Sequence, residues 1–141
     1  MGRAPDLGER MALSPARLDR FARHIVLPEI GGAGQAALAK ARVVLIGLGG
    51  IGSPALQYLA GAGVGALVLV DDDTVEWSNL QRQTIYREGE IDHRKAELAE
   101  VWVNDFDPDI EVFWKVERVT RDNAAGIVAG ADLVLDGCDN F

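Results

Sequence analysis

A glycine-rich hexapeptide is the first group of residues whose types and spacing could do chemistry. Gly47-Leu48-Gly49-Gly50-Ile51-Gly52 matches the pattern GxGxxG, and Asp71 follows at about the distance expected of a ribose-binding carboxylate. Glycines let the backbone turn tightly and approach a phosphate, and the N-terminus of the next helix offers free N–H groups to an anion. The pattern predicts a nucleotide site, and it leaves NAD, FAD and ATP open.

The segment after the ribose carboxylate favours a triphosphate. It reads Asp71-Asp72-Asp73-Thr74-Val75-Glu76-Trp77-Ser78-Asn79-Leu80-Gln81-Arg82-Gln83. A dehydrogenase has no obvious need for this amide-rich run, whereas a triphosphate needs a cation close by, and Arg82 could supply it. Of the three aspartates only Asp71 is expected to bind ribose, because acids at a strand end are usually solvated or cap a turn.

Alternating helix and strand patterns must position these residues. Apolar runs predict strands over 42–46, 66–70, 110–116 and 133–136, and helical patterns cover 51–62, 94–105 and a stretch from Thr120 to about 130. Upstream, Ser14 is expected to cap a helix that runs to about His24, and a short helix is expected over 34–40. The order βαβαβαβ predicts an α/β fold, a Rossmann-like parallel sheet with helices on both faces, truncated after the fourth strand.

Composition bounds the possibilities. The 141 residues, 48% hydrophobic and 26% charged, suit at most one globular domain, and we expect residues 1–13 to be a flexible tail and 14–141 the folded part. A net charge of −8 argues against nucleic acid as a partner, and the apolar run 58–70 is too short to span a membrane. The single cysteine, Cys138, suits a cytoplasmic location and is expected to be a small core residue.

Several short motifs in this order carry a family resemblance. They are Arg20-Phe21-Ala22-Arg23-His24-Ile25-Val26-Leu27, the glycine-rich turn, Gly61-Ala62-Gly63-Val64-Gly65, Asn79-Leu80-Gln81-Arg82-Gln83, Lys95 and Asp136-Gly137-Cys138-Asp139-Asn140-Phe141. From about Arg20 to the last residue the chain resembles the N-terminal portion of the MoeB/ThiF/HesA adenylyltransferases, relatives of the ubiquitin-activating enzymes.

The resemblance implies an ATP- and magnesium-dependent enzyme that adenylates the C-terminal glycine of a ubiquitin-like sulfur-carrier protein of the molybdopterin or thiamine type. In that reading Gly50 lies against the nucleotide and Asp71 binds the ribose. The residues implied around the phosphates are Asn79, Arg82 and Lys95, with magnesium held by Asp139. The resemblance also implies a homodimer in which Arg23 reaches the partner's ATP.

Two departures from the family pattern leave alternatives open. Asp92-His93-Arg94-Lys95 stands where members often have Gly-Gln-Pro-Lys, and without the family Lys95 reads as an ordinary exposed helix lysine. The family also continues for about as much chain again, with paired CxxC zinc sites in many members and the carrier-binding surface, and no such zinc site is expected here. The alternatives are an NAD- or FAD-binding Rossmann oxidoreductase and an inert fragment that binds a partner.

Overall fold

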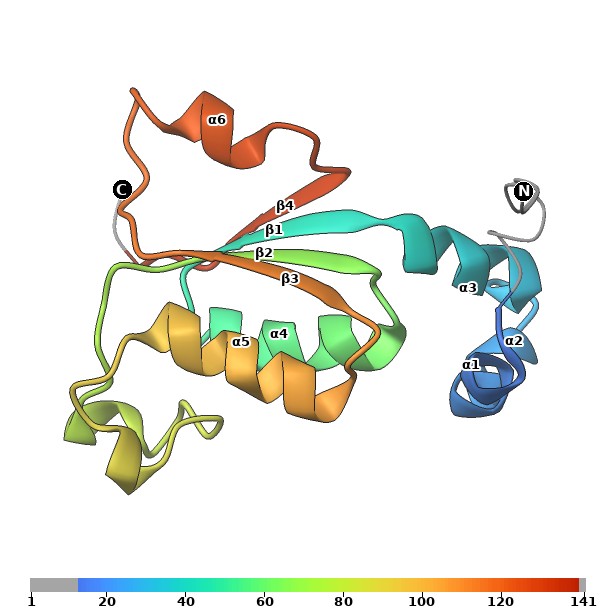
Figure 1. Ribbon diagram of the computed structural model, residues 1–141, viewed down its shortest axis with the longest axis horizontal. Coiled ribbons are helices and arrows are strands. Elements are labelled where there is room, and N and C mark those ends of the chain that lie inside the picture. Colours follow the sequence, from blue (N-terminus) through green and yellow to red (C-terminus); the bar gives the residue numbers. More distant parts are fainter. Residues whose placement is uncertain (1–12, 140–141) are drawn as a thin grey trace, which may run out of the picture.

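Four parallel strands form the sheet of the computed structural model, which describes residues 13–139 (Figure 1). They are β1 (Arg42–Ile46), β2 (Ala66–Val70), β3 (Glu111–Lys115) and β4 (Leu133–Asp136), in the spatial order β3-β2-β1-β4. From β1 the chain adds β2 and β3 on one side and β4 on the other. The strand order therefore reverses beside β1, and at such a point parallel sheets open a crevice at their carboxyl edge.

Helices cover both faces of the sheet, as the sequence predicted. Figure 1 shows α4 (Gly52–Ala62) and α5 (Lys95–Phe106) on one face and α6 (Ala124–Val128) on the other. The larger apolar core lies between the sheet and helices α4 and α5, where side chains such as Leu45, Leu56 and Leu69 are fully buried. A smaller cluster of Val44, Val68, Val70 and Ile127 packs on the other face.

Three short helices precede the sheet. They are α1 (Pro15–Arg20), α2 (Ala22–Ile25) and α3 (Gly31–Lys40). The side chain of Ser14 accepts a hydrogen bond from the Arg17 N–H, which confirms the predicted cap. The single helix predicted to run to His24 is wrong, because it breaks at Phe21, whose ring is buried.

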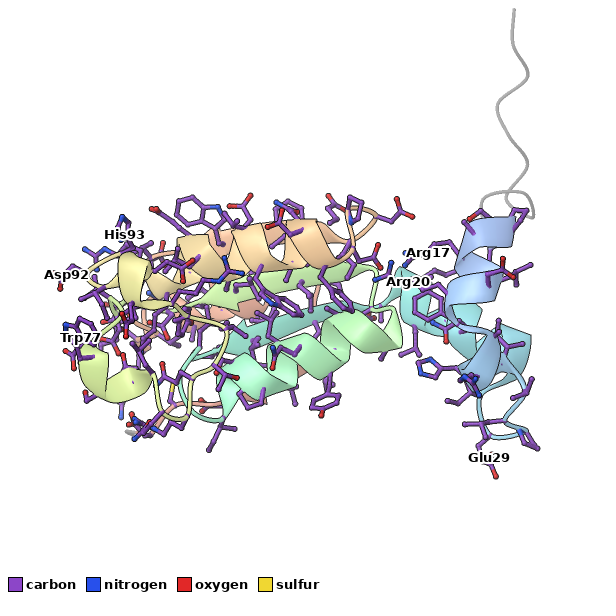
Figure 2. The ribbon with its side chains drawn as sticks, turned by 90° about the horizontal axis from the view of Figure 1, so that it is seen from below. Arg17, Arg20, Glu29, Trp77, Asp92 and His93 are labelled. Carbon is purple, nitrogen blue, oxygen red and sulfur yellow. The ribbon has the colours of Figure 1, made fainter. Side chains whose placement is uncertain are left out.

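An ion pair attaches these helices to the end of α5. Arg17 donates from Nη1 to both carboxylate oxygens of Asp107 at 2.7 Å, and the Asp107 side chain is only 1% exposed. Arg20 stacks over the Phe106 ring at 5.0 Å. In Figure 2, Arg17 and Arg20 lie on the side of α1 that faces the sheet, while Trp77, Asp92 and His93 mark the opposite end of the molecule. The first helices therefore sit far from the carboxyl edge.

Some predicted elements differ from the structure. The helix expected from Thr120 begins at Ala124, because residues 120–123 form a turn in which the Thr120 N–H donates to Oδ1 of Asn123. β3 is one residue shorter at each end than predicted. The tail predicted for residues 1–13 lies outside the described residues except for Leu13. Between residues 13 and 139 no helix is long and apolar enough to cross a membrane.

Apolar side chains remain open to solvent at the edges of the sheet. Leu133 on β4 is 51% exposed and Val134 is 39% exposed, and Trp114 on β3 is 40% exposed. The sheet edge beside β4 is a place where further structure or a partner could pack.

Candidate functional site

A pocket of about 420 Å³ lies at the carboxyl edge of the sheet, at the reversal of strand order. Its walls come from the glycine-rich turn, the ends of β1 and β2, the segment between β2 and α5, the first residue of α5, and the segments after β3 and β4. The predicted site residues that line it are Gly47, Gly49, Gly50, Asp71, Asn79, Arg82, Lys95 and Asp139. Sequence positions nearly a hundred residues apart thus meet in one cavity.

The glycine-rich turn connects β1 to α4 in a conformation that only glycine fits. Gly47 has φ +87°, and a Cβ there would approach the Gly137 backbone to 3.0 Å. A Cβ on Gly52 would overlap the carbonyl oxygen of Gly47. Gly52 does not line the pocket, so its role is to let the helix start close to the strand. The prediction that it binds the nucleotide is not supported by its position.

Leu48, in the middle of this turn, is held through both of its backbone polar groups. Its N–H donates to Oδ2 of Asp71 at 2.7 Å, and its carbonyl accepts from the Tyr86 hydroxyl at 2.7 Å. Its side chain is fully buried. Tyr86 is itself buried, which raises the pKa of its hydroxyl and keeps it protonated as a donor. The turn is therefore fixed before any ligand arrives.

Asp71 both accepts the hydrogen bond from the Leu48 N–H and lines the pocket. Its second oxygen accepts from the Asp73 N–H at 2.7 Å. Burial raises the pKa of its carboxyl, and the two N–H donors and the charge of Lys95 oppose that rise. Each carboxylate oxygen has more than one acceptor position, so Asp71 can still take a hydrogen bond from a ligand hydroxyl.

Lys95 is the least expected side chain in the pocket. It is the first residue of α5, its backbone N–H donates to the Asp73 carbonyl at 3.1 Å, and its side chain is only 5% exposed. The reading of Lys95 as an ordinary exposed helix lysine is wrong. Among residues 13–139 its Nζ makes no direct hydrogen bond or ion pair, although its charge acts on the nearby Asp71 carboxylate. Nζ is not one of the fully buried polar atoms, and Lys95 lines the pocket, so an anion in the pocket could pair with the ammonium group.

Arg82 and Asn79 bring more donors to the same wall. The Arg82 side chain lies across Gly50, where a Cβ would come within 3.3 Å of Nε, and its Nη1 donates to the Ser78 carbonyl at 2.9 Å. Asn79 is 8% exposed and accepts the Glu76 N–H through Oδ1 at 2.9 Å, which leaves its NH₂ group for the pocket. Together with Lys95 these side chains make this wall suited to phosphate oxygens.

Carboxylates also line the pocket. Asp139 follows β4 and is exposed on the pocket wall. Carboxylate oxygens of Asp71, Asp72 and Asp73 lie within 4.8 Å of one another, although Asp71 is already engaged by two backbone N–H groups. Magnesium is usually bound by one or two carboxylates together with substrate phosphates. A single exposed carboxylate such as Asp139 fits that donor set.

Arg23, which the sequence assigns to the partner's nucleotide, is exposed on α2, at the end of the molecule away from the carboxyl edge, and does not line the pocket of its own chain (Figure 1). One side chain lies elsewhere than the sequence predicted. Cys138 is exposed on the pocket wall instead of being a core residue.

Several residues that line the pocket or support its glycine-rich turn were not predicted from the sequence. Tyr86 acts through the Leu48 carbonyl, and nothing in its sequence context indicates that contact. Arg118 reaches the pocket from the segment after β3. Gln83 belongs to the Asn79–Gln83 motif, but the sequence analysis assigned it no role. It is only 2% exposed, and its side chain lies beside Gly49. Its position next to Arg82 in the motif could have indicated that it lines the pocket.

The parallel sheet, the strand-order reversal and the pocket beside a glycine-rich turn define a Rossmann-like domain. The ThiF family model matches residues 21–141, and the chain belongs to the ThiF family. The chain is 47% identical over 131 residues to a SAMP-activating enzyme E1 from Haloferax volcanii, covering 93% of this chain and 48% of the relative.

A second curated relative and a solved structure are also similar to this chain. The sulfur carrier protein ThiS adenylyltransferase of Escherichia coli is 46% identical over 122 residues, which cover 86% of this chain and 49% of the relative. The crystal structure of the E. coli tRNA N6-threonylcarbamoyladenosine dehydratase TcdA in complex with ATP superimposes with a TM-score of 0.82 and 29% identity, covering 92% of this chain and 53% of that one. The chain thus spans about half the length of these relatives.

Proposed function

We propose that the pocket binds ATP and that the chain contributes the ATP-binding half of an adenylyltransferase acting on the C-terminal glycine of a ubiquitin-like sulfur-carrier protein. The observation that carries the proposal is Lys95, a largely buried lysine whose Nζ makes no direct hydrogen bond or ion pair in the described part of the chain, on the wall of a pocket that also presents Arg82 and the glycine-rich turn. The names of the sulfur-carrier adenylyltransferase relatives support the substrate class. The solved relatives that hold ATP and AMP support the nucleotide.

In the proposed function each predicted site residue binds a defined part of the ligand. Asp71 binds the ribose hydroxyls, Gly50 lies against the nucleotide, and Arg82, Lys95 and Asn79 bind phosphate oxygens. Asp139 holds magnesium, which when bound neutralises phosphate charge. The protein works in the cytoplasm as a homodimer in which Arg23 reaches the partner's nucleotide. That last role requires a second subunit, because Arg23 lies on α2, away from its own pocket.

The reaction is a displacement at phosphorus. A carboxylate oxygen of the carrier attacks the α-phosphorus, the bond from that phosphorus to the bridging oxygen breaks, and pyrophosphate leaves with the electron pair. Both reactants are anionic, so catalysis consists mainly of positioning and charge neutralisation. No side-chain nucleophile is needed, which fits the raised pKa of Cys138.

The test is pyrophosphate exchange into ATP, stimulated by a sulfur carrier with a C-terminal glycine, in a protein extended to the length of the relatives. Lys95→Ala, Arg82→Ala and Asp139→Ala should each lower the exchange rate by roughly a hundredfold, since losing a preorganised charge-stabilising group costs about 3 kcal/mol. Cys138→Ala should leave it unchanged. Exchange that survives all three charge substitutions, or that does not need the carrier's terminal glycine, would contradict the proposal.

A further inference from the structure

The carboxamide of Asn123 makes no contact with the helix at whose start it lies. Asn123 directly precedes α6, where an asparagine usually accepts a hydrogen bond from the first N–H groups of the helix, yet its side chain makes no such bond. The side chain turns back along the chain instead. Its Oδ1 accepts from the Thr120 N–H at 2.7 Å, and its Nδ2 donates to the Arg118 carbonyl at 2.9 Å and lies 3.4 Å from Oε2 of Glu117. The carboxamide therefore holds the segment between β3 and α6.

That segment forms one wall of the pocket. Glu117, Arg118 and Val119 line the cavity, whereas Asn123 does not. Val119 also packs against the apolar cluster on the α6 face of the sheet. Glu117 and Arg118 are exposed, and among residues 13–139 the only hydrogen bonds that reach them come from Asn123. The position of this part of the wall thus depends on one carboxamide outside the pocket.

The strand order indicates which part of a nucleotide meets this wall. In the order β3-β2-β1, the end of β2 lies between the glycine-rich turn that follows β1 and the segment that follows β3. In the proposed function the turn and the side chains beside it bind phosphate, and Asp71 at the end of β2 binds ribose. The base then extends past Asp71 toward the segment after β3, where Val119 offers an apolar side chain.

We propose that Asn123 is a positioning residue of the nucleotide site, which holds residues 117–119 where the base of the nucleotide binds. It acts without touching the ligand, because its Nδ2 fixes the Arg118 carbonyl and restrains the Glu117 carboxylate. The inference rests on the proposed ATP site. It gives the nucleoside half of the ligand a determinant of affinity that is separate from the donors assigned to phosphate.

Substitutions at Asn123 can separate its donor from its acceptor. Asn123→Asp keeps an oxygen for the Thr120 N–H, but it loses the NH₂ group and places a carboxylate against the Arg118 carbonyl. Calorimetry uses adenosine, ATP with magnesium and tripolyphosphate with magnesium as separate probes. We expect adenosine and ATP to bind about three- to tenfold more weakly, the usual effect of losing one hydrogen bond, and tripolyphosphate affinity to stay the same. Asn104→Asp, exposed on α5 and outside the pocket, is the control with the same change of charge and should alter none of the three.

Thermal unfolding distinguishes this role from stabilisation of the turn alone. Asn123→Ala loses both contacts, so its melting temperature and its adenosine affinity should both fall. Asn123→Asp should melt close to the unaltered chain, because the contact with Thr120 remains. Unchanged adenosine affinity in Asn123→Asp would overturn the proposal, since nucleoside binding would then follow the turn and not the NH₂ donor, and so would an equal loss of tripolyphosphate affinity. Failure of the unaltered chain to bind ATP would instead contradict the proposed function.

Discussion

Lys95 carries its positive charge where only 5% of the residue reaches solvent. A phosphate oxygen in the pocket would replace the water molecules that its ammonium group loses on folding, so Lys95 should favour ligands that carry phosphate. Its burial could not be predicted from local sequence, because Arg94 before it and Glu97 after it are exposed and give the segment a solvated pattern. Only the family resemblance marked the position.

Replacing Lys95 should separate ligand binding from stability. Lys95→Met keeps the length of the side chain and removes the charge, so ATP affinity should fall by roughly ten- to a hundredfold, the usual effect of losing a hydrogen bond to a charged group. The melting temperature should change little, because Lys95 makes no direct hydrogen bond or ion pair in the described part of the chain. Calorimetry and thermal unfolding measure both. Lys40→Met, at the exposed end of α3, is the control, and equal losses of affinity in the two variants would contradict the assignment.

Cys138 should react slowly despite its exposure. Partial burial, the side-chain hydrogen bond to Asp136 and nearby carboxylates raise the pKa of its thiol to about 11. The thiol therefore stays protonated near neutral pH, and the thiolate forms only as the pH approaches that value. Iodoacetamide alkylation followed by mass spectrometry should be at least about tenfold slower at pH 8 than in the urea-unfolded chain, where cysteine titrates near pH 8.5. A rate that levels off below pH 9 in the folded chain would refute this.

At the scale of elements, the turn between β1 and α4 is a small rigid assembly. Asp71 and Tyr86 hold the two polar groups of Leu48, and Gly47 and Gly52 let strand and helix approach closely. The glycine pattern predicted the turn, because tight backbone geometry selects glycine directly. It could not predict Tyr86, because a hydroxyl that reaches a carbonyl 38 residues away leaves no local signal.

Two glycines of α4 should respond oppositely to the same substitution. Gly52→Ala would drive a methyl group into the Gly47 carbonyl, and we expect a loss of about 2 to 4 kcal/mol in the free energy of unfolding together with weaker ATP binding. Gly61→Ala lies in the same helix with no atom near its Cβ, so it should gain up to about 1 kcal/mol. Urea denaturation compares them. Similar unfolding free energies in the two variants would show that the turn tolerates relaxation.

The regular elements were largely predictable, and their irregular ends were not. The runs 42–46, 66–70 and 133–136 match β1, β2 and β4, because continuous β-branched and leucine side chains are typical of parallel strands covered by helices. The start of α6 was missed because Asn123 hydrogen-bonds the Thr120 N–H and forms a turn before the helix begins. Side-chain competition of this kind is weakly encoded in periodicity.

For the whole molecule, two features bear on association with a second subunit: the exposed apolar side chains and the position of Arg23. Val26 and Leu27, shortly after Arg23, are 76% and 46% exposed, and Leu133 is exposed on the edge strand β4. The Arg17–Asp107 ion pair fixes α1 against the end of α5, so Arg23 is presented outward on a firmly attached segment. This arrangement suits a residue that acts on a second subunit.

Association of the chain should therefore be measurable. We expect sedimentation equilibrium at micromolar concentration to show dimers or larger assemblies, because apolar patches of this kind favour contact with another surface. Val26→Asp should weaken the association if the Arg23 segment forms the interface, and Leu133→Asp should do so if the sheet edge does. A well-behaved monomer over the whole concentration range would count against the role of Arg23 in the partner's pocket.

The most direct measurement is calorimetric titration of the chain with ATP and magnesium, compared with NAD and FAD under the same conditions. Lys95, Arg82 and Asn79 gather donors for several phosphate oxygens, so saturable binding of ATP and little or no binding of NAD or FAD is the expected result. Saturable binding of NAD without binding of ATP would contradict the account and support an oxidoreductase site in the same fold.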